Sequence, residues 1–109
     1  MPTTYKVLGQ VAPSATTATT LETVHAATQV VMSTIAVCNR AATAATYRIA
    51  VRPAGATLAN EHYIAYDAPI AANDSIFLTI GVTLATTDVV TVYASTANLS
   101  FSAFGTEIA

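Results

Sequence analysis

The chain has very little charge for its length. Only four of its 109 residues are Lys or Arg and six are Asp or Glu, which gives a net charge of −2. Four cations are too few to form the basic surface that binds phosphate backbones, so nucleic acid is not an expected partner. The sequence also lacks a basic amphipathic helix, so no membrane-surface role is expected.

Cysteine, glycine and long apolar runs are also scarce. Cys38 is the only cysteine, which excludes an intrachain disulfide and predicts a small buried strand residue. Four glycines are too few for a loop that cradles phosphate. No apolar run is long enough to cross a membrane, and the opening residues Met1–Lys6 lack the apolar stretch of a signal peptide. We therefore expect synthesis and folding in a reducing cytoplasm.

The residues that are abundant are small and uncharged. The chain is 53% hydrophobic, and alanine and threonine together make up about two-fifths of it. Soluble proteins normally keep apart through surface charge, which this chain largely lacks. The composition therefore indicates a structural or assembly role, with a surface that other protein covers.

Alternating polar and apolar residues predict a β-protein. In Tyr47–Arg52, Tyr47, Ile49 and Val51 share one face while Arg48 and Arg52 share the other, so a one-residue slip would bury both arginines. Turn residues separate similar runs at intervals near ten residues, which is typical of an antiparallel sandwich. The expected strands are Tyr5–Gln10, Leu21–His25, Gln29–Cys38, Tyr47–Arg52, His62–Tyr66, Ile76–Val82, Val90–Ala94 and Leu99–Ala103.

We therefore predict an all-β fold, a single antiparallel β-sandwich of about eight strands, Ig-like or jelly-roll-like, over residues 1–109. Residues 12–20, rich in Ala and Thr, are expected to form an exposed loop or an arm along a neighbour. Gln29–Cys38 is apolar on both faces, which predicts burial on both sides. In His62–Tyr66, alternation places Tyr63 and Ala65 on one side.

No catalytic, cofactor or metal site is predicted. A Ser/His/Asp hydrolase site can be drawn from His25 or His62, but no serine lies in a nucleophile elbow. His25, His62 and Cys38 lack the spacing of zinc ligands. The aspartates match no calcium loop and are interpreted as turn formers.

The aromatic residues suggest a contact surface. Aromatic side chains are enriched at interfaces, although Tyr47 and Phe101 are expected in the core. The predicted interface residues are Tyr5, Tyr63 and Phe104, together with Ala12, Thr16 and Thr19 of the low-complexity segment.

Several strand-and-turn segments follow one another in a distinctive order: Tyr5–Gln10, Val30–Arg40, Tyr47–Gly55, His62–Asp67, Ile70–Asp74, Thr87–Ala94 and Leu99–Ile108. In this order the chain resembles a family of small virion structural proteins of tailed bacteriophages. One segment, Glu22–Ala26, departs from the resemblance, because the family tends to carry a proline where this chain has His25. The loss of that proline makes the following turn less rigid.

The resemblance implies a non-enzymatic component of the virion. We expect a capsid decoration or cement protein that stabilises the shell, with the major capsid protein or other virion proteins as partners. A homo-oligomer is expected, with a trimer favoured. The alternative is a tail, neck or head-fibre module that binds a host-surface glycan through Tyr63 or Tyr66.

Overall fold

The protein consists almost entirely of β-strands, together with two short 3-10 helices. The computed structural model describes residues 3–109. Within them, no helix is long and apolar enough to cross a membrane. The elements are β1 (Thr3–Val11), β2 (Thr19–Thr23), β3 (Gln29–Asn39), β4 (Ala45–Arg52), η1 (Pro53–Gly55), η2 (Asn60–His62), β5 (Tyr63–Ile70), β6 (Ser75–Leu84), β7 (Val89–Ala94) and β8 (Leu99–Ile108).

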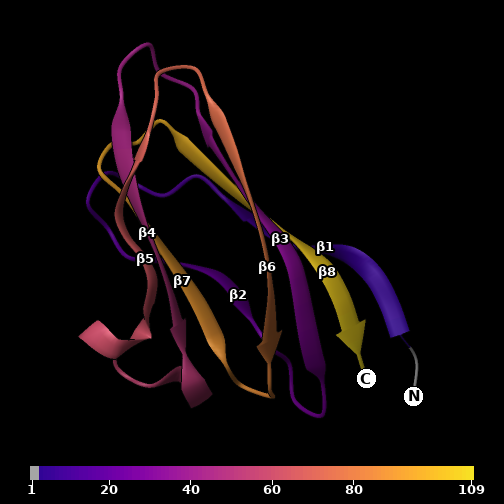
Figure 1. The fold of residues 1–109 in the computed structure, drawn as a ribbon. Coiled ribbons are helices and arrows are strands. Elements are labelled where there is room, and N and C mark those ends of the chain that lie inside the picture. The colour runs from indigo at the N-terminus through magenta and orange to yellow at the C-terminus, as the bar shows by residue number, and fades with distance from the viewer. Residues whose placement is uncertain (1–2) are drawn as a thin grey trace.

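The strands form two four-stranded antiparallel sheets that face each other (Figure 1). Sheet A has the order β1-β8-β3-β6, and sheet B has the order β2-β7-β4-β5. The predicted all-β sandwich is confirmed, and each expected strand is present. Strands near the end of the sequence, β7 and β8, occupy inner positions and pair with strands from the first half.

The core lies between the sheets and is made of the inward side chains of each strand. Phe101, Met32, Ile35 and Ile49 are completely buried there, as alternation predicts. Tyr47 meets Phe101 edge-on, with ring centroids 6.3 Å apart. The sequence prediction for these two aromatic residues is confirmed.

The outward side of β3 is where the sequence interpretation was wrong. Its residues alternate between buried and accessible along the strand, so only one face is covered. The outward positions Val31, Ala36 and Cys38 have no second layer over them, which leaves Val31 exposed and Cys38 half-buried rather than buried. Apolar residues therefore lie on the outer surface of sheet A.

Asn39 holds the loops together at one end of the sandwich. Its side-chain amide nitrogen donates to the carbonyl oxygens of Thr43 and Ala71 at 2.8 and 3.1 Å. Its side-chain oxygen accepts from the Ala41 amide at 3.0 Å. The β3–β4 and β5–β6 loops, seen together at the top of Figure 1, are thus joined by one buried side chain.

The low-complexity segment, residues 12–20, lies against the sandwich. Ala12 and Thr16 lie in the β1–β2 connection, whereas Thr19 already belongs to β2. Pro13 is buried, and the Thr16 amide donates to the Ala94 carbonyl at 2.8 Å. Most of the remaining side chains between residues 12 and 18 are exposed.

Candidate functional site

The outer face of sheet A carries a cluster of exposed apolar side chains. Tyr5 and Val7 of β1, Val31 of β3 and Phe104 of β8 define what we call the sheet A patch. Val7 and Phe104 are cross-strand neighbours within contact distance, and Thr106 lies between Tyr5 and Val31 on the same face. Tyr5 is the most exposed, at 82%.

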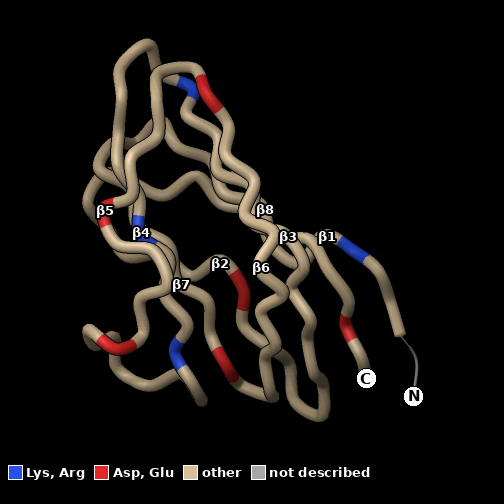
Figure 2. The backbone as a smooth tube through the Cα atoms, viewed as in Figure 1, with Lys and Arg blue, Asp and Glu red and all other residues tan. Residues whose placement is uncertain are grey.

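No charged side chain lies on this outer face among residues 3–109. The remaining outward positions on β8, β3 and β6 are mainly serine and threonine, with Gln29, Ala36, Cys38, Phe77 and Ile108. Lys6 alternates with Tyr5 and Val7, so it points to the opposite side of the sheet and pairs with Glu107 at 3.6 Å. Figure 2 shows how sparse charge is along these strands. The face can therefore be dehydrated without burying an ion.

The outer face of sheet B differs because it is organised around Arg48. The guanidinium makes two hydrogen bonds to the Asp67 carboxylate, from Nε at 2.7 Å and from Nη2 at 3.3 Å. It also lies 4.2 Å from the centre of the Tyr66 ring and 4.3 Å from that of Tyr93. The Asp67 hydrogen bond raises the pKa of Arg48, so its charge is permanent.

Tyr63 joins this cluster because β5 is irregular. Ala50 lies opposite Tyr63 and Ile49 opposite Ala65, so Ile64 is an extra residue in the strand. The bulge reverses the alternation and places Tyr63 against Tyr66, with ring centroids 4.9 Å apart. The expectation that Tyr63 and Ala65 share a side was therefore wrong. Beside these rings an open hollow of about 470 Å³ is lined by Asn60, Tyr63 and Tyr66.

The residues predicted to form an interface do not lie on one surface. Tyr5 and Phe104 are together in the sheet A patch, whereas Tyr63 lies on the outer face of sheet B. Ala12 and Thr16 belong to the connection between the sheets, and Thr19 lies on the edge strand β2. Sequence reasoning missed Val7, Val31 and Phe77, although each alternates with an inward-facing apolar residue.

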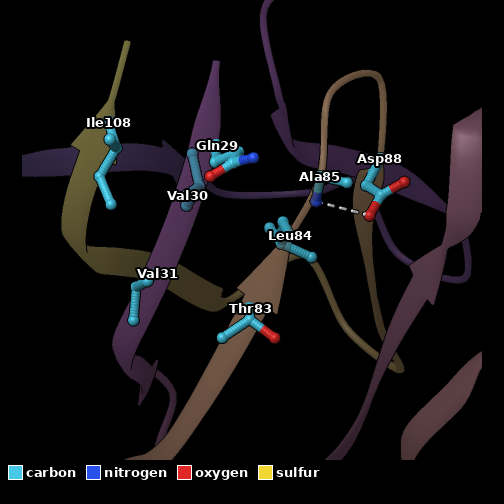
Figure 3. A pocket seen from close by; sticks show the side chains of 8 residues that line it. All are labelled: Gln29, Val30, Val31, Thr83, Leu84, Ala85, Asp88 and Ile108. Atoms are coloured by element: carbon cyan, nitrogen blue, oxygen red, sulfur yellow. Dashed lines mark hydrogen bonds between the residues drawn. The ribbon is translucent and has the colours of Figure 1, made fainter. Parts of the chain in front are cut away.

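A second hollow, of about 370 Å³, lies where β3 begins and where β6 and β8 end (Figure 3). Its lining is mostly aliphatic, and Asp88 is its one ionisable side chain. The Asp88 carboxylate accepts hydrogen bonds from the Ala85 and Ala54 amides, both at 2.9 Å. Asp88 thus fixes the β6–β7 turn and the start of η1, which matches its interpretation as a turn former.

The other residues considered for chemistry are dispersed. His62 accepts a hydrogen bond from the Ala59 amide at its Nδ1, within η2. His25 is exposed in the β2–β3 connection, and Cys38 lies on the outer face of sheet A. Within residues 3–109, no three His, Cys, Asp or Glu side chains converge on a point where they could hold a metal ion.

The architecture defines the chain as an antiparallel β-sandwich with an apolar, uncharged outer face on sheet A. No family model, curated protein or solved structure matches it.

Proposed function

We propose that the protein is a non-enzymatic structural component of a bacteriophage virion, a decoration or cement protein that binds the assembled capsid. The observation that carries this proposal is the sheet A patch. Tyr5, Val7, Val31 and Phe104 are exposed apolar side chains on a face with no charge among the described residues. The choice of a virion as the assembly is supported by the resemblance of the strand-and-turn segments to virion proteins.

The physical basis is burial of this patch against shell subunits. Burying a fully exposed side chain of this kind contributes about 1.5–3 kcal/mol, and no ion has to be dehydrated. Val31 and Phe104 contribute less because each is only 36% exposed. Association itself costs at least about 4 kcal/mol, which offsets much of the gain from one patch. A homo-oligomer that presents several patches gains effective concentration and binds tightly. Because the protein binds only the assembled shell, it stabilises that shell by mass action.

Particles assembled with and without the protein provide the test. Deleting its gene from the encoding genome is expected to lower particle survival after heating and osmotic shock, and added purified protein is expected to restore it. Protein with Tyr5→Ser and Phe104→Ser is expected to fold but not to restore survival. Tyr66→Ser, on the opposite sheet, serves as the matched control and is expected to restore it. Deleted particles of normal resistance would reject the proposal.

A second candidate function, binding of a host-surface glycan from a tail, neck or head fibre, is favoured by the outer face of sheet B. Tyr66 is 57% exposed, and Asn60 adds an amide beside Tyr63 in the adjoining hollow. Aromatic rings with nearby hydrogen-bonding groups are suited to a ligand with an apolar face and polar edges. Arg48 holds the Tyr66 ring in place.

A glycan array probed with the isolated protein separates the two functions. Glycan binding predicts retention of specific sugars that Tyr66→Ala abolishes and Tyr5→Ala leaves unchanged. Even labelling of capsid faces in electron micrographs, with no glycan retained, would reject this second function and favour the first.

A further inference from the structure

The outer edge of β6 is the least protected of the four sheet edges in the described chain. Exposed strand edges pair with other chains unless charge, proline, bulges or short length prevent it. The edge strand β1 carries Lys6, and β2 is only five residues long and carries Glu22. The edge strand β5 contains Asp67, Pro69 and two register shifts. By contrast, β6 has ten residues without charge or proline, and its one register shift lies between Thr79 and Val82, beyond its first half.

The first half of β6 has a regular backbone, so the amides and carbonyls that face away from β3 can be identified. The Asn39 amide donates to the Asp74 carbonyl, so the polar backbone groups of Asp74 point toward β3. In an antiparallel strand this direction alternates, which turns the amides and carbonyls of Ser75, Phe77 and Thr79 toward the open edge. The Ser75 amide agrees with this assignment, because it donates to the Asp74 carboxylate rather than to β3.

We propose that two copies of this chain associate through their β6 edges around a two-fold axis at Phe77. Phe77 then lies opposite the partner copy's equivalent residue and exchanges two backbone hydrogen bonds with it. Ser75 of each copy lies opposite Thr79 of the other, and each Thr79 amide donates to a Ser75 carbonyl. The contact is isologous, because one surface is used by both copies. This inference is independent of the proposed function, and it proposes a dimer in place of the trimer favoured from the sequence.

The partner that we propose for the open edge of β6 is a second copy of this chain, because two uncharged β6 strands match each other. Among the edge strands of residues 3–109, β6 alone has no charged residue within its bounds, so the pair β6–β6 places no ionic residue inside the paired strands. The nearest charge is Asp74, just before β6, whose carboxylate accepts from the Ser75 amide at the end of the paired segment. The extension also places the exposed rings of the two Phe77 side chains next to each other on the outer face. At present this ring is 68% exposed at the margin of sheet A.

The core-facing side chains of β6 give a second reason to propose a β6–β6 contact. Ile76 and Leu78 point toward the core but are only partly buried, because no strand lies beyond β6. In the proposed register, Ile76 of one copy lies opposite Leu78 of the other, so each covers its counterpart. Nearby, Ile64 and Ile80 remain exposed around an apolar hollow of about 270 Å³ between β5 and β6. The dimer continues both the sheet and the core across the axis.

Sedimentation equilibrium of the full chain tests the contact directly. The native protein is expected to have twice its 11.2 kDa chain mass. Phe77→Lys and Phe77→Glu place like charges at the axis, so each alone is expected to weaken dimerisation about 100-fold or more. An equimolar mixture of the two is expected to recover the dimer, which a merely misfolded variant does not do. Tyr5→Lys, on the far edge of the same face, is the matched control and is expected to remain dimeric.

A cysteine pair tests the register. The Cα atoms of hydrogen-bonded partners in antiparallel strands are about 5.5 Å apart, which suits a disulfide. In a Cys38→Ser background, Phe77→Cys is expected to form a covalent dimer on oxidation, whereas Thr83→Cys on the same strand is not. A native chain that is monomeric or trimeric, failure of the charged mixture to associate, or crosslinking at residue 83 instead of residue 77 would overturn the proposal.

The same variants keep this proposal separate from the proposed function. Tyr5→Lys is expected to abolish capsid binding while the dimer persists, because Tyr5 belongs to the sheet A patch. Phe77→Lys is expected to reduce the dimer whether or not the protein binds a capsid. Loss of capsid binding with an intact dimer thus concerns the patch alone, and loss of the dimer concerns β6.

Discussion

The buried amide of Asn39 links two loops that lie far apart in the sequence. It makes three hydrogen bonds to the backbone of Thr43, Ala71 and Ala41. Asn39→Ala removes all three, and each contributes about 1 kcal/mol net, so we expect the free energy of unfolding to fall by about 3 kcal/mol. Urea denaturation of the variant measures this. Asn98→Ala, at an exposed turn position, is expected to change stability by less than about 0.5 kcal/mol.

Glu22 gives the molecule a predictable dependence on pH. Partial burial on β2 raises the pKa of this carboxyl, and the nearby Glu107 adds to the shift. A folded-state pKa above the unfolded value favours the protonated form, so stability is full in acid and is lost as pH rises through the folded pKa. Glu22→Gln is therefore expected to be more stable than the native protein at neutral pH.

Denaturation midpoints across acidic to neutral pH measure this effect. The advantage of Glu22→Gln is expected to vanish below the unfolded pKa, where the native carboxyl is also neutral. Glu61→Gln, at an exposed position, serves as the control. An advantage that stayed constant with pH would contradict the assignment.

At the scale of the strand, β1 approaches β2 so closely that one position requires glycine. A Cβ atom on Gly9 would lie 2.1 Å from the Leu21 carbonyl oxygen, which belongs to the opposite sheet. Gly9→Ala must move one strand away from the other, so we expect a loss of about 2 kcal/mol or more in unfolding free energy. Thermal unfolding provides the measurement, with Gln10→Ala on the same strand as a nearly neutral comparison.

Regular strands were predictable from the sequence, whereas irregular ones were not. Period-two alternation identified β4 and its buried Tyr47, because the arginines in the same strand fix its facing. The facing of Tyr63 was not predictable, since the extra residue at Ile64 has no glycine or proline to mark it. Val31 was missed because an apolar run was interpreted as burial on both sides. The sheet A patch could therefore be found only in part, through Tyr5 and Phe104.

At the scale of the whole molecule, pairing connects the two ends of the chain. Thr3 lies opposite Ile108, and β8 lies between β1 and β3. Closing such long loops is unfavourable before the contacts form, which slows folding. We expect refolding in milliseconds to seconds, as for other sandwiches. Stopped-flow tyrosine fluorescence checks this, and completion within microseconds would contradict it.

The inner positions of β7 and β8 also affect how the protein forms on the ribosome. β8 joins β1 to β3 in sheet A, and β7 joins β2 to β4 in sheet B. Until residues 89–108 leave the exit tunnel, β1 and β2 have no hydrogen-bonding partner, and the nascent chain exposes the apolar side chains of the unfinished core. The sandwich therefore closes only after its last two strands have emerged, and chaperone capture before that point is expected to affect its yield.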